Sequence, residues 1–366
     1  MKLLRALFGF CLLLFVGFAN AQDQNKSQLN QQVIVDKLNH PWAVEWLTEN
    51  QILISERNGN LVLFNPDDNS RTKLEIPALV YRRGQGGVLD LKKHPNYHQN
   101  SYIYITFSIK KSKYQNLATT ALARFNINKN KIENFEILYT AKPWQNSDRH
   151  FGSRIVFDQN ILIYFSVGDR GNRKLAQDLT SDLGKIIYLQ DDGNFVKDPP
   201  FKQNPAVFSY GHRNPQGLLF HNDILYEHEH GPRGGDEVNI IEKGSNYGWA
   251  VISYGKEYLS NRQVGEGVAK EGMEQPLHYW TPSIAPSGFD ILIKKDHPWH
   301  NDFFVGSLKF GYLERLELKN NKVVKSEKLY GDSWGRVREV NIRNGDIYIL
   351  TDSKKGKLIK LNIKSQ

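Results

Sequence analysis

"ILISERNGNLVLF", residues 52–64, and "IYILTDSKKGKLIKL", residues 347–361, follow the same pattern almost position by position. In each stretch an apolar strand ends in charged residues, a glycine follows, and a second strand alternates apolar and polar side chains. β-Branched and aromatic residues between turn formers are typical of strands, so each stretch predicts a β-hairpin. Because the two hairpins lie near opposite ends of the chain, the pattern favours an architecture that repeats.

Similar strand–turn–strand stretches lie between the two hairpins, and helix signals are nearly absent. Examples are "SYIYITFS" at 101–108, "ILIYFSVGDRG" at 161–171 and "FFVGSLKFGYLERLEL" at 303–318. Repetition in a β pattern predicts an all-β fold, specifically a propeller or another closed β array, and six blades of roughly 55–60 residues would use the chain. A sandwich of this length without a linker is less favoured, so we expect one domain over 22–366.

The first 21 residues, "MKLLRALFGFCLLLFVGFANA", are predicted to be a signal peptide that is cleaved off. Lys2 and Arg5 precede an apolar stretch that is too short to span a membrane, and Ala19-Asn20-Ala21 fits a cleavage site. Cys11 is the only cysteine, so the mature chain has no disulfide and depends on an ordinary core, closed sheets or metal ions. With no further apolar run of spanning length, we expect a soluble protein of the periplasm or one that is secreted.

The formal charge of +9, which falls to +7 without Lys2 and Arg5, does not indicate a nucleic-acid partner. There is no Lys/Arg-rich run, helix-turn-helix pattern or RNA-binding signature. The most basic stretch, "KKSKYQNLATT", is typical of a solvated loop. A net positive charge of this size is explained by its contribution to solubility alone.

Polar residues recur at about one blade length and are therefore candidates for the hub of a propeller. Gln85 lies in "YRRGQGGVLDLKKHP", His150 follows 65 positions later, and Arg213 with Asn214 follows 63 positions after that. Tyr258, Lys309, Arg336 and Arg338 come later in the chain. Each has an ordinary explanation by itself, since a Gln beside glycines is most often a turn and an Arg-x-Arg strand face is most often solvated.

A functional site is favoured over these ordinary explanations because four cations would all point into one cavity of the predicted propeller. They are Arg213, Lys309, Arg336 and Arg338. Cations collected in a confined site repel one another and require an anionic occupant. A ligand with several carboxylates or phosphates would satisfy them, and Arg offers bidentate geometry for such groups.

A second group of candidates lies in "EHEHGPRGGDEVNIIEKGSNYGW", residues 227–249. His228 and His230 alternate with Glu227 and Glu229 on a predicted strand, and no zinc-like spacing follows. The Gly-Pro-x-Gly-Gly-Asp-Glu loop offers carbonyls and carboxylates, which suit a hard cation such as calcium. A plain glycine-rich turn explains this loop equally well.

Taken together, these motifs resemble the soluble PQQ-dependent aldose sugar dehydrogenases of the glucose/sorbosone dehydrogenase family. The resemblance runs from "HPWAVEWL" near residue 40 to "LTDS" near 350 and includes "HFGSRIVFD", "GHRNPQGL", "SLKFG" and "GRVREV". It implies a six-bladed β-propeller, bound pyrroloquinoline quinone (PQQ), calcium (Ca²⁺) and oxidation of aldose sugars to lactones. Ser153 stands where a second glycine is common in the family.

The resemblance also assigns roles to residues. The general base falls on His150, the carboxylate that orients it on Asp169, and a further catalytic role, stabilisation of the oxyanion on the reduced quinone, on Arg213. The quinone contacts fall on Gln85, Arg213, Asn214, Tyr258, Ser307, Leu308, Lys309, Arg336, Val337 and Arg338. Calcium contacts fall on Glu237, Tyr247, Gly231 and Pro232.

Three functions are therefore open at this stage. The first is a periplasmic PQQ- and calcium-dependent aldose dehydrogenase that passes electrons to an unidentified acceptor, as a monomer or homodimer. The second is a calcium-dependent propeller hydrolase, such as a lactonase, and the third is a non-catalytic propeller that binds carbohydrate or partner proteins. The fold alone does not separate them.

Overall fold

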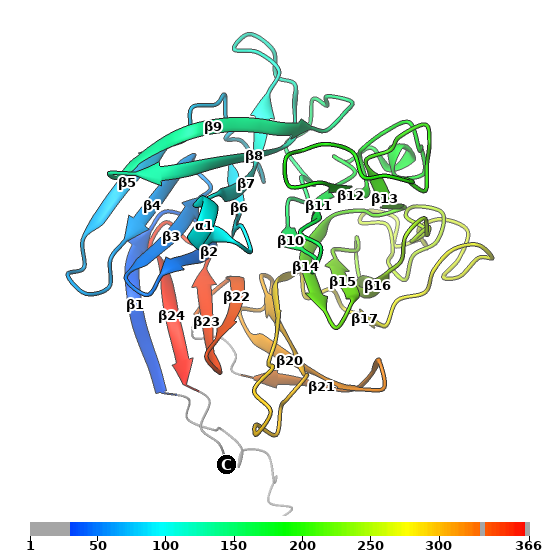
Figure 1. The fold of residues 1–366 in the computed structure, drawn as a ribbon. Coiled ribbons are helices and arrows are strands. Elements are labelled where there is room, and N and C mark those ends of the chain that lie inside the picture. The colour runs from blue at the N-terminus through cyan, green and yellow to red at the C-terminus, as the bar shows by residue number, and fades with distance from the viewer. Residues whose placement is uncertain (1–29, 330–333, 363–366) are drawn as a thin grey trace, which may run out of the picture.

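A computed structural model describes residues 30–329 and 334–362, and it shows six four-stranded antiparallel sheets arranged as blades around a central axis (Figure 1). The predicted all-β, six-bladed propeller is confirmed. The predicted signal peptide at 1–21 lies outside the described residues, so that prediction and the assignment of 22–366 to one domain stay predictions.

Each of the first three blades is a simple meander in which neighbouring strands follow one another in the chain. The first blade contains β2 (Pro41–Thr48), β3 (Gln51–Glu56), β4 (Asn60–Phe64) and β5 (Arg71–Glu75). The second contains β6 (Val88–Lys93), β7 (Ile103–Lys110), β8 (Ala118–Asn128) and β9 (Lys131–Thr140). The third contains β10 (Ile155–Phe157), β11 (Ile163–Val167), β12 (Lys185–Leu189) and β13 (Val207–Tyr210).

The fourth and fifth blades repeat this order, and the sixth combines the two ends of the chain. The fourth contains β14 (Pro215–His221), β15 (Ile224–Glu229), β16 (Asp236–Ile241) and β17 (His278–Trp280). The fifth contains β18 (Pro286–Ile291), β19 (Phe303–Ser307), β20 (Leu313–Lys319) and β21 (Lys322–Leu329). The sixth contains β22 (Val337–Arg343), β23 (Asp346–Thr351), β24 (Gly356–Asn362) and β1 (Asn30–Leu38).

The ring is closed by β1, which pairs antiparallel with β24, so that Val33 lies opposite Ile359. The first strand of the described chain thus supplies the outer strand of the last blade (Figure 1). Closure leaves no blade without a neighbour on either side, which removes exposed apolar blade faces. The hairpins predicted from 52–64 and 347–361 are β3–β4 and β23–β24, the second and third strands of their blades.

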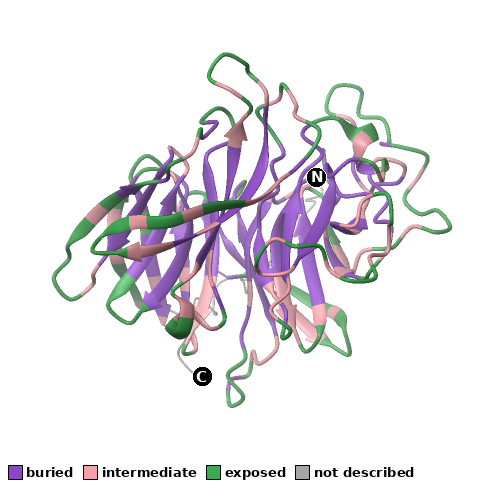
Figure 2. Cartoon of the chain, turned by 45° about the horizontal axis from the view of Figure 1, so that its top comes forward, coloured by how far each residue is buried: buried purple, intermediate pink, exposed green. Residues whose placement is uncertain are grey.

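Burial falls from the axis outwards (Figure 2). The innermost strands of successive blades are neighbours around the axis, and β2 is buried along nearly its whole length. The outer strand β21 is mostly exposed, and no residue of the outer strand β9 is buried. Because blades pack face to face, apolar side chains of adjacent sheets form the core between them, as in the group around Phe107 and Phe125. The helices among the described residues, α1 (Tyr97–Asn100) and the 3₁₀ turn η1 (Arg173–Ala176), are single turns, and neither could cross a membrane.

Arg154 links several blades across the axis. Its Nε donates to the carbonyl of Gln216 at 2.6 Å, and its guanidinium also bonds to Glu339 and, at 3.4 Å, to Asp90. Gln216 lines the larger of two axial cavities, whereas Arg154 lines the smaller one, of about 420 Å³. This buried network therefore separates the two cavities.

Candidate active site

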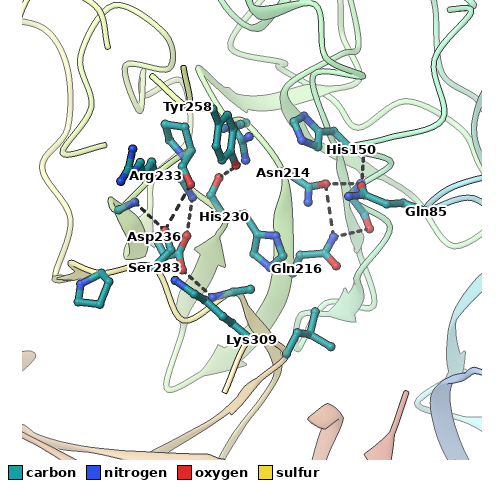
Figure 3. A pocket seen from close by; sticks show the side chains of 18 of the residues that line it. Gln85, His150, Asn214, Gln216, His230, Arg233, Asp236, Tyr258, Ser283 and Lys309 are labelled. Atoms are coloured by element: carbon teal, nitrogen blue, oxygen red, sulfur yellow. Dashed lines mark hydrogen bonds between the residues drawn. The ribbon is translucent and has the colours of Figure 1, made fainter. Parts of the chain in front are cut away.

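A cavity of about 910 Å³ lies where the innermost strands begin, and all six blades contribute to its wall. Figure 3 shows part of this wall, with Gln85, His150 and Lys309 among the labelled side chains. In blade order, its lining includes Arg57, Gln85, His150, Arg213, Lys309 and Arg338. Gln85, His150 and Arg213 belong to segments that lead from one blade into the next, whereas Arg57 and Lys309 lie in turns within a blade and Arg338 lies in β22. The predicted hub residues, which are far apart in the sequence, thus meet in one cavity.

His150 is held in a defined orientation by Asp169, which follows β11 in the same blade. His150 Nδ1 lies 2.7 Å from Asp169 Oδ1. Because an ionised carboxylate only accepts, Nδ1 carries the hydrogen and Nε2 is left to accept a proton. Both residues are buried, and Asp169 does not itself line the cavity. The orienting carboxylate thus lies behind the imidazole.

The second oxygen of Asp169 is held by Trp249, a residue that the sequence did not single out. Its indole Nε1 donates to Asp169 Oδ2 at 2.7 Å, and the backbone N–H of Gly171 donates to Oδ1 at 2.7 Å. The same indole ring lies beneath Arg213, whose guanidinium carbon is 5.3 Å from the ring centroid. Trp249 therefore connects the imidazole–carboxylate pair to one of the predicted cations.

The pKa values of the pair shift in directions that suit a proton acceptor. Burial and the nearby positive charge of Arg213 lower the pKa of His150, while Asp169 opposes the change. Burial raises the pKa of Asp169, but the hydrogen bond and charge of His150 and the charge of Arg213 outweigh it, so the net pKa is lowered. At neutral pH the pair is thus a neutral imidazole beside an ionised carboxylate.

The backbone conformation at His150 limits which residues can occupy the neighbouring positions. His150 has a φ of +54°, and its N–H donates to Gln85 Oε1 at 2.7 Å. A Cβ at Gly168 would overlap the carbonyl of His150, so only glycine fits there. Ser153, which stands where the resemblance implies a glycine, has a φ of +99° and is buried. The loop therefore keeps a glycine-like conformation despite the serine.

The four predicted cations all line the cavity, each in a different setting. Arg213 donates from Nη1 to the carbonyl of His230 at 2.9 Å. Arg338 is buried and donates to Gln216 Oε1 at 3.0 Å. Arg336 Nε donates to Asp352 Oδ2 at 3.2 Å. Lys309 is exposed, and its Nζ lies 4.8 Å from the ring centroid of Phe310.

Asp352 is the only acidic group paired with these cations among the residues that the structure describes. Burial lowers the pKa of Arg338 to about 9 although Asp352 opposes the change. Burial raises the pKa of Asp352, but the charge of Arg338 and the hydrogen bond from His40 outweigh burial. The net pKa of Asp352 is lowered to about 2. Arg213 and Arg338 are two like charges that are buried at the same cavity, which indicates a site that suits an anion.

The other predicted quinone contacts fall into two groups. Gln85, Asn214, Leu308 and Tyr258 line the cavity, and Tyr258 is 59 % exposed. Ser307 and Val337 are buried and do not line it. The Ser307 hydroxyl donates to the carbonyl of Ile284 at 2.7 Å, and Val337 packs in an apolar cluster. The side chains of these two residues therefore lie behind the cavity wall.

The predicted calcium residues divide between two adjoining cavities. Gly231 and Pro232 line the large cavity, and Gly231 also lines a small one together with Glu237 and Tyr247. Burial and the charge of Glu229 raise the pKa of Glu237 well above its usual range. No ion pair is formed by Glu237 within the described ranges, and a carboxylate that is costly to ionise fits a place for a cation.

A neighbouring cluster of His212, Glu227 and Glu229 was not predicted as a metal site. One ligand atom of each lies within 4.8 Å of the others, and all three residues are buried. Glu227 Oε1 and His212 Nδ1 have no hydrogen-bond partner among the described residues. Alternation on β15 puts Glu227 and Glu229 on one face. His228 lies 4.9 Å from the Phe289 ring, measured between centroids, on the other face. The sequence shows that Glu227 and Glu229 alternate with histidines, but it contains no signal that His212 lies beside them.

Comparisons with known proteins identify similar sequences and a similar structure. The sequence profile of the Glucose / Sorbosone dehydrogenase family matches residues 38–360. The chain is 33 % identical over 363 residues to "Aldose sugar dehydrogenase YliI" of Escherichia coli strain K12, covering 96 % of this chain and 98 % of that protein. It is 31 % identical to "Quinoprotein glucose dehydrogenase B" of Acinetobacter calcoaceticus, over 81 % of this chain and 66 % of that one. The crystal structure of the soluble aldose sugar dehydrogenase of E. coli in its apo-form superposes with a TM-score of 0.86 at 32 % identity, over 92 % of this chain and 100 % of that one.

Proposed function

The chain belongs to the Glucose / Sorbosone dehydrogenase family and is a sugar dehydrogenase, and we propose that it oxidises aldoses at C1 to lactones with bound pyrroloquinoline quinone and calcium. The observation that carries this proposal is the convergence of Arg213, Lys309 and the pair Arg336 and Arg338 on the cavity that also contains His150. A hydrolase or a non-catalytic propeller would have no need for this collection of cations.

The cavity fits the quinone in charge and in size. Pyrroloquinoline quinone carries three carboxylates, and the four cations offer charged hydrogen-bond donors for them. Arg338 would be the most valuable contact, because its charge is already desolvated and its acidic partner Asp352 is 3.9 Å away. The volume of about 910 Å³ leaves room for a sugar beside the cofactor. A relative named as a quinoprotein supports the same cofactor class.

The proton chemistry belongs to His150. When bound, the quinone would accept the hydride that leaves C1 of the aldose. His150 Nε2 takes the proton of the C1 hydroxyl, so that loss of one hydride and one proton converts the sugar into its lactone. Asp169 keeps Nδ1 protonated and stabilises the imidazolium that forms. Arg213, fixed by the carbonyl of His230, holds positive charge at the cavity and would stabilise the oxyanion on the reduced quinone.

Calcium would be held by oxygen donors of the fourth blade. Glu237 supplies a half-buried carboxylate, and Tyr247, Gly231 and Pro232 would supply backbone carbonyls. These are the ligand types that calcium prefers. Bound calcium would bring positive charge next to the quinone site and remove the burial penalty on Glu237.

The cellular location, the electron acceptor and the oligomeric state stay predictions. Export to the periplasm or secretion rests on residues 1–21, outside the described ranges. The electron acceptor is unidentified, and the protein is expected to act as a monomer or homodimer.

Reconstitution tests the proposal directly. Purified protein is supplied with pyrroloquinoline quinone and calcium, and dye reduction is followed with glucose and other aldoses. We expect reduction that requires both additions. Absence of reduction with every aldose would favour the hydrolase, which a lactone substrate then tests.

His150→Ala separates chemistry from binding. We expect calorimetry to show unchanged quinone affinity while turnover falls at least 10²-fold, because general-base catalysis is worth about that much. His98→Ala on α1, an exposed histidine that does not line the cavity, is the matched control. Equal loss of affinity and turnover would instead make His150 structural.

A further inference from the structure

The cavity contains more positive charge than the proposed cofactor explains. Among the described residues that line it, seven side chains are cationic and one, Asp236, is acidic. Asp236 is buried, and its two oxygens accept the N–H groups of Gly231 and Ala285 at 2.8 Å each. It therefore braces the loops and does not reach the cations at the rim.

Five of the seven cations can be assigned to the quinone side of the cavity. Arg213, Lys309, Arg336 and Arg338 are the proposed carboxylate contacts. Arg57 belongs with them, because its charge acts on both Asp352 and Arg338. The three carboxylates of the quinone and Asp352 together nearly balance this group. Calcium bound at the Gly231 and Pro232 carbonyls would only increase the positive excess.

The remaining two cations, Arg233 and Lys256, form what we call the rim pair. Arg233 lies in the loop between β15 and β16, and Lys256 lies in the long segment between β16 and β17. Their backbones form an antiparallel bridge, with N–H to carbonyl distances of 3.2 Å and 3.1 Å in the two directions. Residues opposite each other in such a bridge point their side chains to the same side, with their Cβ atoms about 5 Å apart.

No acidic side chain within the described ranges pairs with either member of the rim pair. Both residues are exposed and both line the cavity. Glu257, which is next to Lys256, bonds to Arg173 through both of its oxygens instead. Like charges directly opposite each other on a bridge are destabilising, so their retention at the cavity mouth needs another reason.

We propose that the rim pair is a subsite for an anionic group on the sugar, so that the preferred substrate is an acidic aldose. This inference rests on the proposed aldose oxidation. A sugar whose C1 hydroxyl reaches His150 occupies the cavity, and its end remote from C1 points towards the rim. The substituent that meets Arg233 and Lys256 is therefore carried at C6, as a phosphate ester or as the carboxylate of a uronic acid. Both groups accept charged hydrogen bonds from Arg and Lys.

Steady-state kinetics of the reconstituted protein test the subsite. Glucose, glucose 6-phosphate and glucuronate are compared with the unmodified protein, Arg233→Met, Lys256→Met, the double variant and Lys322→Met. The control Lys322 is an exposed lysine on β21, outside the cavity lining. The phosphate and uronate arms distinguish the two sources of the anion.

We expect at least one anionic sugar to exceed glucose in kcat/KM by roughly tenfold, with about threefold lost for each single substitution and the whole preference lost in the double variant. The change should fall on KM, glucose should be unaffected, and the preference should shrink as salt is raised. Lys322→Met should change nothing.

Two results would overturn the subsite while leaving aldose oxidation standing. One is oxidation of glucose with no preference for either anionic sugar. The other is a double variant that alters the KM for an anionic dye but not for the sugar, which would place the rim pair on the path of the electron acceptor. If no aldose is oxidised, the proposed function fails separately. Calorimetry then decides the subsite: glucose 6-phosphate or glucuronate that binds the unmodified protein and not the double variant supports it, and equal or absent binding rejects it.

Discussion

Replacing Asp169 with asparagine should disable the proposed base while leaving the fold and the cofactor site intact. The two carboxylate oxygens accept three hydrogen bonds, from His150 Nδ1, Gly171 N–H and Trp249 Nε1, each at 2.7 Å. An asparagine has only one oxygen to offer, and the N–H groups of Gly171 and Trp249 can only donate. Whichever way the amide turns, one donor loses its acceptor.

The size of the effect follows from these contacts. If the amide oxygen keeps Gly171, the indole of Trp249 loses its acceptor at a cost of about 1–3 kcal/mol. If the amide nitrogen faces His150, the imidazole must place its hydrogen on Nε2 and can no longer accept the sugar proton. In either orientation the imidazolium loses its counter-charge. The corresponding substitution in a serine-protease triad lowers kcat about 10⁴-fold, and we expect a loss between about 10² and 10⁴ here.

The assay compares kcat with quinone affinity in one preparation. Dye reduction with glucose gives kcat, and calorimetry gives the dissociation constant of the quinone, which should stay within a factor of three. Asp178→Asn is the matched control, because this exposed aspartate lies in the same loop region and does not line the cavity. A variant at Asp169 that keeps more than a tenth of the kcat would refute the role given to this carboxylate.

Three further predictions follow from charges that the fold buries. Because burial and Arg213 lower the pKa of His150, kcat/KM should rise with pH through a limb below 6.5 and be level at neutral pH; a limb well above 6.5 would contradict a neutral base. Arg338→Met should weaken quinone binding at least tenfold by calorimetry, whereas Arg343→Met, at the other end of β22, should not; equal affinities would remove Arg338 from the cofactor site. Lys185→Met removes three ammonium bonds of 2.8–2.9 Å to backbone carbonyls and should lower the free energy of unfolding by about 3 kcal/mol, measured with urea. Burial lowers the pKa of Lys185 to about 7, so the unfolded chain binds more protons above that pH, and the stability of the unmodified protein relative to the variant should increase from pH 7 to 10.5; a flat difference would mean that the lysine stays charged.

Much of the candidate site could be predicted because its members sit in short motifs, several of which lie in segments that lead into a blade. Repetition places such positions on one axis, so spacing alone was enough to bring Gln85, His150 and Arg213 to a common hub. Ser307 and Val337 show the limit of that reasoning. Both lie in the expected motifs, but strand alternation and packing turn their side chains away from the cavity.

Local pattern by itself determined the blades, because turn residues and alternating apolar residues act between neighbours in the chain. The hairpins β3–β4 and β23–β24 needed no distant information. Only the tertiary structure decided which distant groups meet: β1 against β24, Trp249 behind Asp169, His212 beside Glu227, and Arg233 opposite Lys256. The physical reason is that these contacts depend on closure of the ring and on the paths of the long connecting segments. Charge, burial and proton affinity at the site are properties of that assembled environment, so no stretch of sequence carries them alone.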